Sequence, residues 1–156
     1  MVPENLKDKT VCIVGLGYVG QPLAEAFSKH IRTIGFDIDQ TKIEKINAYN
    51  HLNNGTLVCA DDPSSIKEAD FVLICVPTPV TKNKEPDLLP VKSAAEIVGR
   101  NLKQNSIVIL ESTVYPGVTE EIVAPILENE SGMSCGRDFK VGYSPERINP
   151  GTMSTQ

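Results

Sequence analysis

The stretch that most constrains this chain is TVCIVGLGYVG, residues 10–20. Its first half, Thr10–Val14, is an unbroken β-branched and apolar run, which predicts a strand buried on both faces. Gly15, Gly17 and Gly20 follow and predict a tight turn into a helix. In such a unit the first glycine permits the turn, the second lets a phosphate approach the backbone, and the third lets the helix pack on the strand. The stretch therefore predicts a pyrophosphate site at a helix N-terminus.

The residues after the turn support this interpretation. They repeat at the spacing of one apolar helix face: Val19, Leu23, Ala26 and Phe27. A second strand, Thr33–Phe36, then ends at Asp37, about 20 residues after the first glycine, where dinucleotide-binding units carry an acid. A carboxylate there accepts ribose hydroxyls and repels a 2′-phosphate, and no arginine directly follows it, so NAD is favoured over NADP. The alternative, a glycine turn beside an acid that only caps a helix, leaves the complete pattern unexplained.

Length and composition restrict the class of protein. The chain has 156 residues, 40% of them hydrophobic and 22% charged, which is typical of one globular domain with a single core. A net charge of −5 argues against nucleic acid or an anionic membrane as partner. The longest apolar run, Phe71–Val76, is too short to span a bilayer, and Met1–Lys9 lacks the apolar core of a signal peptide. We therefore expect a cytoplasmic protein.

Cysteine and histidine positions argue against a metal or disulfide framework. The four cysteines form no C-x-x-C pair, and there are two histidines, His30 and His51. No metal site is predicted. Cys12 and Cys75 fall inside apolar strands, where a small buried side chain is the simpler interpretation.

Strands and helices alternate along the whole chain. The predicted strands are Thr10–Val14, Thr33–Phe36, Thr56–Cys59, Phe71–Val76, Ser106–Leu110 and Lys140–Tyr143. The predicted helices follow Gly20, span Asp39–Asn50 with Asp39 as N-cap, begin at Asp62-Pro63, and span Val91–Leu102 and Thr119–Asn129, the last kinked or broken at Pro125. This pattern predicts an α/β fold: a Rossmann-type, doubly wound, parallel six-stranded sheet in the order 3-2-1-4-5-6. We expect a single nucleotide-binding domain at 10–150, with a lead-in at 1–9 and a tail at 151–156.

The unusual loops all follow predicted strands. They are the glycine turn, Asp37, Pro77–Pro79, Ser112-Thr113 and Pro145-Glu146. Ligands of doubly wound sheets bind at the carboxyl ends of the strands, so these loops are expected to meet in one crevice.

Four motifs together resemble one known family. VCIVGLGYVGQPLA near the start, VPTP at 76–79, ESTVYPG at 111–117 and GYSPERINPG at 142–151 are similar to the nucleotide-sugar 6-dehydrogenases, the UDP-glucose/UDP-ManNAc dehydrogenase family. Its members oxidise the C6 alcohol of a UDP-hexose to a carboxylate with two NAD. PERINPG resembles the branch that acts on UDP-N-acetylhexosamines, UDP-GlcNAc or UDP-ManNAc, for bacterial surface polysaccharides. The UDP-glucose branch is the alternative, disfavoured by Pro150, where that branch has an acid.

The resemblance implies a set of cofactor-binding residues. The backbone at Tyr18 and Val19 and the carboxylate of Asp37 would hold NAD, in addition to the three glycines. Thr78 and Thr113 would line the cofactor crevice, and Lys42 would lie near the adenosine ribose. The simpler interpretation of Thr78, between two prolines, is that it only stiffens its loop.

The resemblance also implies catalytic and substrate residues. Thr113 and Glu146 match the catalytic pair on this domain, and Arg147 and Ile148 match positions that meet the nucleotide sugar. Family members form a thioester with a cysteine thiol and then hydrolyse it, which needs a base to activate water and a hydroxyl to orient it. Glu146 would be the base and Thr113 the hydroxyl. Without the resemblance, the Ser112-Thr113 pair satisfies backbone groups in a turn, and Glu146 and Arg147 are solvated loop residues.

The chain also departs from the family pattern. Members continue through a dimer-forming helix into a second domain, which shares the UDP-sugar site and supplies a lysine and the nucleophilic cysteine, whereas this sequence ends at Gln156. None of its four cysteines matches that nucleophile. We therefore expect no turnover from these residues alone. Full-length members are homo-oligomers, but this sequence lacks their dimer-forming helix, so the oligomeric state of this chain stays open. The connection between Ile46 and Thr56 is also shorter than in the family.

Two other functions remain possible from the sequence. One is a different two-domain hydride-transfer enzyme, such as a hydroxyacid dehydrogenase, against which ESTVYPG and SPERINPG argue. The other is a non-catalytic NAD-binding module.

Overall fold

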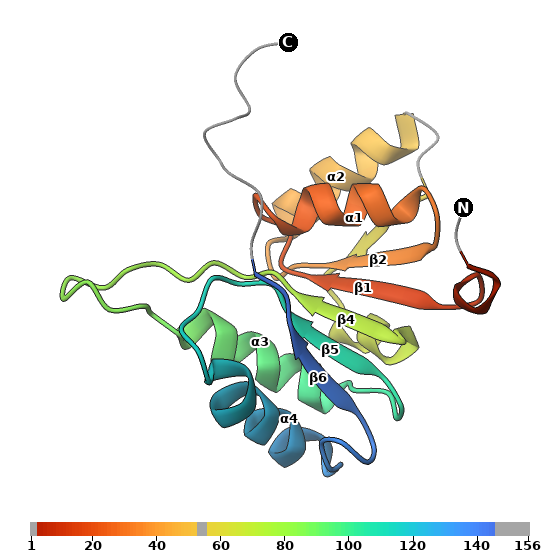
Figure 1. Ribbon diagram of the computed structural model, residues 1–156. Helices are drawn as coiled ribbons and strands as arrows, with labels where there is room; N and C mark the ends of the chain where they lie inside the picture. Colours follow the sequence, from red (N-terminus) through yellow and green to blue (C-terminus); the bar gives the residue numbers. More distant parts are fainter. Residues whose placement is uncertain (1–2, 53–55, 146–156) are drawn as a thin grey trace.

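The centre of the molecule is a parallel sheet of six strands (Figure 1). A computed structural model describes residues 3–52 and 56–145, and in it the strand order is β3-β2-β1-β4-β5-β6. The strands are β1 (Thr10–Val14), β2 (Arg32–Phe36), β3 (Val58–Ala60), β4 (Phe71–Ile74), β5 (Ile107–Leu110) and β6 (Lys140–Tyr143). The predicted fold class and strand order are confirmed.

Helices cover both faces of this sheet. They are η1 (Glu4–Leu6), α1 (Gly20–Ser28), α2 (Gln40–Leu52), η2 (Pro63–Glu68), α3 (Leu89–Arg100), the π-helical turn η3 (Thr119–Val123) and α4 (Ala124–Ser131). Figure 1 shows α1 and α2 on one face and α3 and α4 on the other. This follows from the strand order, because right-handed crossovers place helices on opposite faces when the strand order reverses direction. None of the helices in residues 3–52 and 56–145 combines the length and apolar character needed to cross a bilayer.

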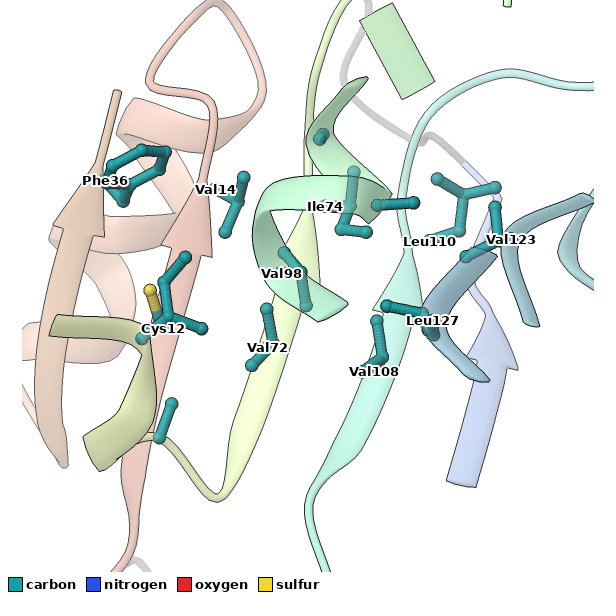
Figure 2. Close-up of a cluster of buried hydrophobic side chains, with 14 of the residues drawn as sticks. Cys12, Val14, Phe36, Val72, Ile74, Val98, Val108, Leu110, Val123 and Leu127 are labelled. Carbon is teal, nitrogen blue, oxygen red and sulfur yellow. The ribbon is translucent and has the colours of Figure 1, made fainter. Parts of the chain in front are cut away.

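Two apolar clusters hold the layers together. On the face of α3 and α4, Val98 lies over Val72 of β4, and Leu127 lies beside Val108 of β5 (Figure 2). On the face of α1 and α2, the cluster includes Ile13 from β1, which is fully buried. Alternate residues of one strand thus serve opposite clusters, which is why β1 and β4 read as continuous apolar runs.

The helix boundaries follow local chemistry. Asp39 caps α2 as predicted, since its Oδ1 accepts a hydrogen bond from the Lys42 N–H at 3.1 Å. Asp62 likewise caps η2 through the Ser64 N–H at 2.9 Å. The helix predicted at 119–129 is divided into a π-helical turn and α4, and Pro125 lies in the first turn of α4. The π-helical turn runs directly into α4, so the irregular part of this helical segment lies just before Pro125, which has no N–H to donate.

Four of the six predicted strands differ from the structure at a boundary. By one residue each, β2 begins at Arg32 rather than Thr33 and β5 at Ile107 rather than Ser106. The third strand begins at Val58 rather than at Thr56, because β3 pairs only with the carboxyl half of β2, from Ile34 to Phe36. The fourth strand ends at Ile74 rather than at Val76, three residues before Pro77, the first proline of the following loop. That loop projects away from the sheet before the chain enters α3 (Figure 1).

The backbone ladder continues one residue past the strands at their carboxyl ends. Three such bonds run from the N–H of Gly15 to Phe36 O, of Cys75 to Val14 O and of Glu111 to Ile74 O, at 2.8, 2.8 and 2.9 Å. They fix the starting points of three loops at one edge of the sheet. The side chains of those loops gather at this edge and build the candidate site.

Candidate functional site

The glycine turn after β1 has the geometry that the sequence predicts. Gly15 has φ +93°, a left-handed conformation that disfavours other residues. A Cβ at Gly20 would lie 1.7 Å from the carbonyl oxygen of Gly15, so helix α1 can approach the turn this closely only with glycine there. A Cβ at Gly17 would meet nothing within 4 Å, and Gly17 is exposed. The turn therefore combines a tight backbone contact with an open position at Gly17.

The N-terminus of α1 is available to an anion. The first residues of a helix carry N–H groups without intrahelical partners and a partial positive charge. Within the described residues, no side chain caps this end, where Val19 is the N-cap. Tyr18 and Val19 follow Gly17 in the turn, and all three residues line the cleft described below.

The carboxylate of Asp37 accepts three hydrogen bonds at this edge of the sheet. Its Oδ2 accepts the Leu16 N–H at 2.7 Å and the Lys42 ammonium at 2.9 Å, and its Oδ1 accepts the Asp39 N–H at 2.9 Å. Burial by itself would raise the pKa of Asp37, but the two N–H groups and Lys42 outweigh it and lower the pKa below its ordinary value. Asp37 is 7% exposed and stays charged at neutral pH.

These bonds limit what Asp37 can still accept. A carboxylate offers about four acceptor positions, of which the three donors occupy three. One position on Oδ1 remains for a ribose hydroxyl. A second hydroxyl requires the Lys42 ammonium to move, which the long and partly exposed lysine side chain allows. Sequence reasoning placed both hydroxyls on Asp37 and did not foresee this competition.

A cleft of about 950 Å³ runs along the carboxyl ends of the strands. Among the residues that the sequence assigned to a site, the cleft lining includes Gly15, Gly17, Tyr18, Val19, Asp37, Lys42, Thr78 and Thr113. Gly20 is buried beneath the turn. Glu146, Arg147 and Ile148 lie outside the described residues.

Side-chain hydroxyls join the two loops on the far side of the cleft. Ser112, which follows β5, donates from Oγ to the carbonyl of Val76 at 2.6 Å. Thr78, which follows β4, donates from Oγ1 to the carbonyl of Thr113 at 2.8 Å. Thr78 therefore does more than stiffen its own loop, and Ser112 satisfies a backbone group of a neighbouring loop rather than of its own turn.

The family model of the UDP-glucose/GDP-mannose dehydrogenase family, NAD binding domain, matches residues 9–156. The chain belongs to this family. The resemblance inferred from the four motifs is thereby confirmed, and NAD is the cofactor that this domain binds.

Individual relatives agree with this assignment. The chain is 47% identical to the protein CapL of Staphylococcus aureus, covering 92% of this chain and 36% of CapL. It is 46% identical to a UDP-N-acetyl-D-glucosamine 6-dehydrogenase of Salmonella typhi, covering 94% of this chain and 37% of that enzyme. The solved structure of a UDP-D-ManNAc dehydrogenase from Pyrococcus horikoshii superposes with a TM-score of 0.83 at 34% identity, over 91% of this chain and 37% of that one. The chain thus spans well under half the length of these relatives.

The geometry fits the family's NAD. Asp37 belongs to the β1–β3 half of the sheet, where the first mononucleotide half of such folds binds the adenosine. The open Gly17 and the uncapped start of α1 lie beside it and suit the pyrophosphate. The loops after β4 and β5 form the other half of the cleft, which is left for the nicotinamide.

Sequence reasoning missed one wall of the cleft. Helix α3 lines it through Leu89, Pro90, Ser93, Ala94 and Ile97, and Ile38 adds an exposed side chain beyond Asp37. The sequence predicted this helix at Val91–Leu102, whereas α3 begins two residues earlier, at Leu89. The prediction therefore omitted Leu89 and Pro90 from the helix, and nothing in it indicated that the helix lines the cleft.

The contact between Gly20 and Gly15 makes a selective prediction. We expect Gly20→Ala to lower the free energy of unfolding by about 3 kcal/mol, because the added methyl overlaps a backbone oxygen that cannot move alone. Gly17→Ala should change it by less than about 1 kcal/mol, since that methyl meets open space. Urea denaturation measures both. Equal destabilisation by the two variants would contradict the assigned geometry.

The lowered pKa of Asp37 predicts a pH-dependent stability. Its carboxylate contributes fully above its unfolded pKa, about 3.9, and the contribution is lost as the pH falls through the lower folded-state pKa. We expect the difference in unfolding free energy between wild type and Asp37→Asn to hold from about pH 7 to 5 and then to shrink below about pH 4. Lys42→Met removes one of three donors and should keep part of this dependence. A difference that stays constant down to about pH 2.5 would contradict the bonding scheme.

Proposed function

We propose that the chain is the NAD-binding domain of a 6-dehydrogenase that oxidises the C6 alcohol of a UDP-N-acetylhexosamine, UDP-GlcNAc or UDP-ManNAc, to a carboxylate. One observation carries the proposal: a single cleft collects the glycine turn, Asp37 and Thr113, in a chain that is 46% identical to a UDP-N-acetyl-D-glucosamine 6-dehydrogenase. A role in surface-polysaccharide synthesis follows from the same resemblance.

In this proposal, each half of the cleft has its own task. Asp37 accepts an adenosine ribose hydroxyl at its open position, and Lys42 moves aside to donate to the ribose. The backbone of Gly17, Tyr18 and Val19 binds the pyrophosphate. When bound, NAD supplies the hydride acceptor, and the loops carrying Thr78 and Thr113 orient the nicotinamide against the sugar.

Thr113 is the proposed catalytic hydroxyl on the described part of the domain. Its carbonyl is held by Thr78, and its residue is exposed at the cleft, where it can meet a water or a substrate oxygen. Glu146 is proposed as the base that activates water for the final hydrolysis. Arg147 and Ile148 are proposed to contact the nucleotide sugar.

The nucleophilic thiol is proposed to come from a second domain. Burial raises the pKa of Cys12 to about 12 and that of Cys59 to about 11, so neither thiolate is available at neutral pH. Cys75 lines the cleft but is only 6% exposed. Cys135 precedes β6, at the amino end of the strand, whereas the cleft lies at the carboxyl ends. The proposal accordingly keeps the NAD-binding domain at 10–150 and assigns the substrate-binding domain to a further part of the protein.

Two further elements complete the proposal. We place the protein in the cytoplasm, because four free cysteines suit a reducing compartment. We also propose that the full-length protein forms a homo-oligomer, as the resemblance implies, with no nucleic acid or membrane partner. Two alternative functions are oxidation of UDP-glucose and a non-catalytic NAD-binding role. The next two experiments distinguish the proposal from them.

Nucleotide selectivity tests the role of Asp37. We expect calorimetry to show NAD binding at least about tenfold tighter than NADP binding, because the buried carboxylate opposes a 2′-phosphate. Asp37→Asn should weaken the binding of NAD and strengthen the binding of NADP, since Lys42 is then an uncompensated cation beside the ribose. Lys42→Ala, which removes the proposed donor to the ribose, should weaken NAD binding, and Lys45→Ala, one turn along α2 and exposed, is its matched control. Unchanged preference in Asp37→Asn would remove Asp37 from the ribose site.

Turnover tests the reaction. With the protein encoded by the complete reading frame, NADH absorbance should rise with UDP-GlcNAc or UDP-ManNAc, two NADH per sugar, and much less with UDP-glucose. Thr113→Val should lower kcat by about 100-fold, and Thr113→Ser, which keeps the hydroxyl, should restore most of it. The 156 residues alone should bind NAD without turnover. Activity of these residues alone, or a preference for UDP-glucose, would contradict the proposal.

A further inference from the structure

A backbone hydrogen bond from the Glu111 N–H to the Ile74 carbonyl, 2.9 Å long, continues the ladder between β4 and β5 one residue past the strands. In this register the even-numbered residues of β4 face β5, so the next positions toward the cleft on the β4 side are Val76 and Thr78. At these two positions side-chain hydroxyls join the two loops that flank the second half of the cleft.

Two side-chain hydroxyls join these loops by hydrogen bonds. The Ser112 Oγ donates across to the Val76 carbonyl at 2.6 Å, and the Thr78 Oγ1 donates back to the Thr113 carbonyl at 2.8 Å. We call this reciprocal pair of bonds the hydroxyl brace. Each loop supplies one donor and one acceptor, so neither loop can shift away from the other without breaking both bonds.

We propose that Ser112 is a positioning residue for the nicotinamide half of NAD, acting through the hydroxyl brace together with Thr78. The inference deepens the proposed function, on which its assignment of the cleft halves rests. Ser112 lines the cleft but is only 5% exposed, and its hydroxyl donates to Val76, so the role proposed for the hydroxyl is exerted through that bond. Val76 and Thr113, which it aligns, both line the cleft.

The brace is local to one half of the cleft. Asp37 and Lys42 are held by Leu16 and by one another, and the brace touches none of these residues. Loss of the brace should therefore weaken the binding of a ligand that reaches the β4 and β5 loops. It should leave unchanged the binding of a ligand that ends at the pyrophosphate. ADP is such a shorter probe, because it carries the adenosine and both phosphates but no nicotinamide.

The chain provides matched controls for both hydroxyls. Ser106, at the other end of β5, is buried and donates from Oγ to the Lys103 carbonyl at 2.7 Å. Thr33, in β2, is buried and donates from Oγ1 to the Ile31 carbonyl at 3.0 Å. Ser106→Ala and Thr33→Val thus remove the same type of bond far from the cleft.

The experiment compares NAD and ADP affinities by calorimetry, with urea denaturation to verify folding. Ser112→Ala should lower the affinity for NAD about fivefold to tenfold, which is the effect of losing one hydrogen bond, and should change the affinity for ADP by less than about twofold. Thr78→Val should do the same, and Thr78→Ser should restore NAD binding. Ser106→Ala and Thr33→Val should lower the free energy of unfolding without changing the ratio of NAD affinity to ADP affinity.

Three results would overturn the inference. One is an equal loss of NAD and ADP affinity in folded Ser112→Ala, and another is no loss of either. The third is a wild-type chain that binds NAD no better than ADP. A failure of the full-length protein to oxidise UDP-N-acetylhexosamines would contradict the proposed substrate, but it would leave this difference between ligands intact, so the two failures can be told apart.

Discussion

The hydrogen bond from the Leu16 N–H to Asp37, 2.7 Å long, is the contact on which the site depends. It joins the turn after β1 to the end of β2, two segments that are far apart in the sequence. Gly15, the residue directly before Leu16, has a positive φ in this turn. The bond fixes the acid and the turn before α1 relative to each other, so the groups that we propose to bind the ribose and the pyrophosphate are held in place by the fold itself.

An acidic chain can hold a polyanion in this way without a general positive surface. The net charge is −5, and the donors at the cleft are backbone N–H groups, a helix N-terminus and the ammonium of Lys42. The Leu16 and Asp39 N–H groups, together with Lys42, outweigh the effect of burial on the pKa of Asp37 and keep its carboxylate ionised inside the fold. The two halves of the cleft are thus preorganised by different means: ionic and backbone bonds around Asp37, and the hydroxyl brace between the proline-containing loop and Ser112-Thr113.

Much of this architecture could be predicted from the sequence, because it depends on short-range patterns. The apolar run before Gly15 and the glycine spacing specify a strand, a turn and a helix, and the acid after Phe36 marks the neighbouring strand end. What escaped prediction depends on distant partners. The register of β3 on β2, the engagement of Lys42 with Asp37 and the reach of α3 into the cleft are all decided by packing between separate elements. Ser112 looked like an ordinary turn residue because its acceptor, Val76, lies on another loop.

A crystal structure of the chain with NAD bound tests the proposed site most directly. We expect the adenosine ribose within hydrogen-bond distance of Asp37, the pyrophosphate against Gly17 and the first turn of α1, and the nicotinamide between the loops of Val76 and Thr113. NAD bound elsewhere, or an adenosine ribose without contact to Asp37, would contradict the proposal.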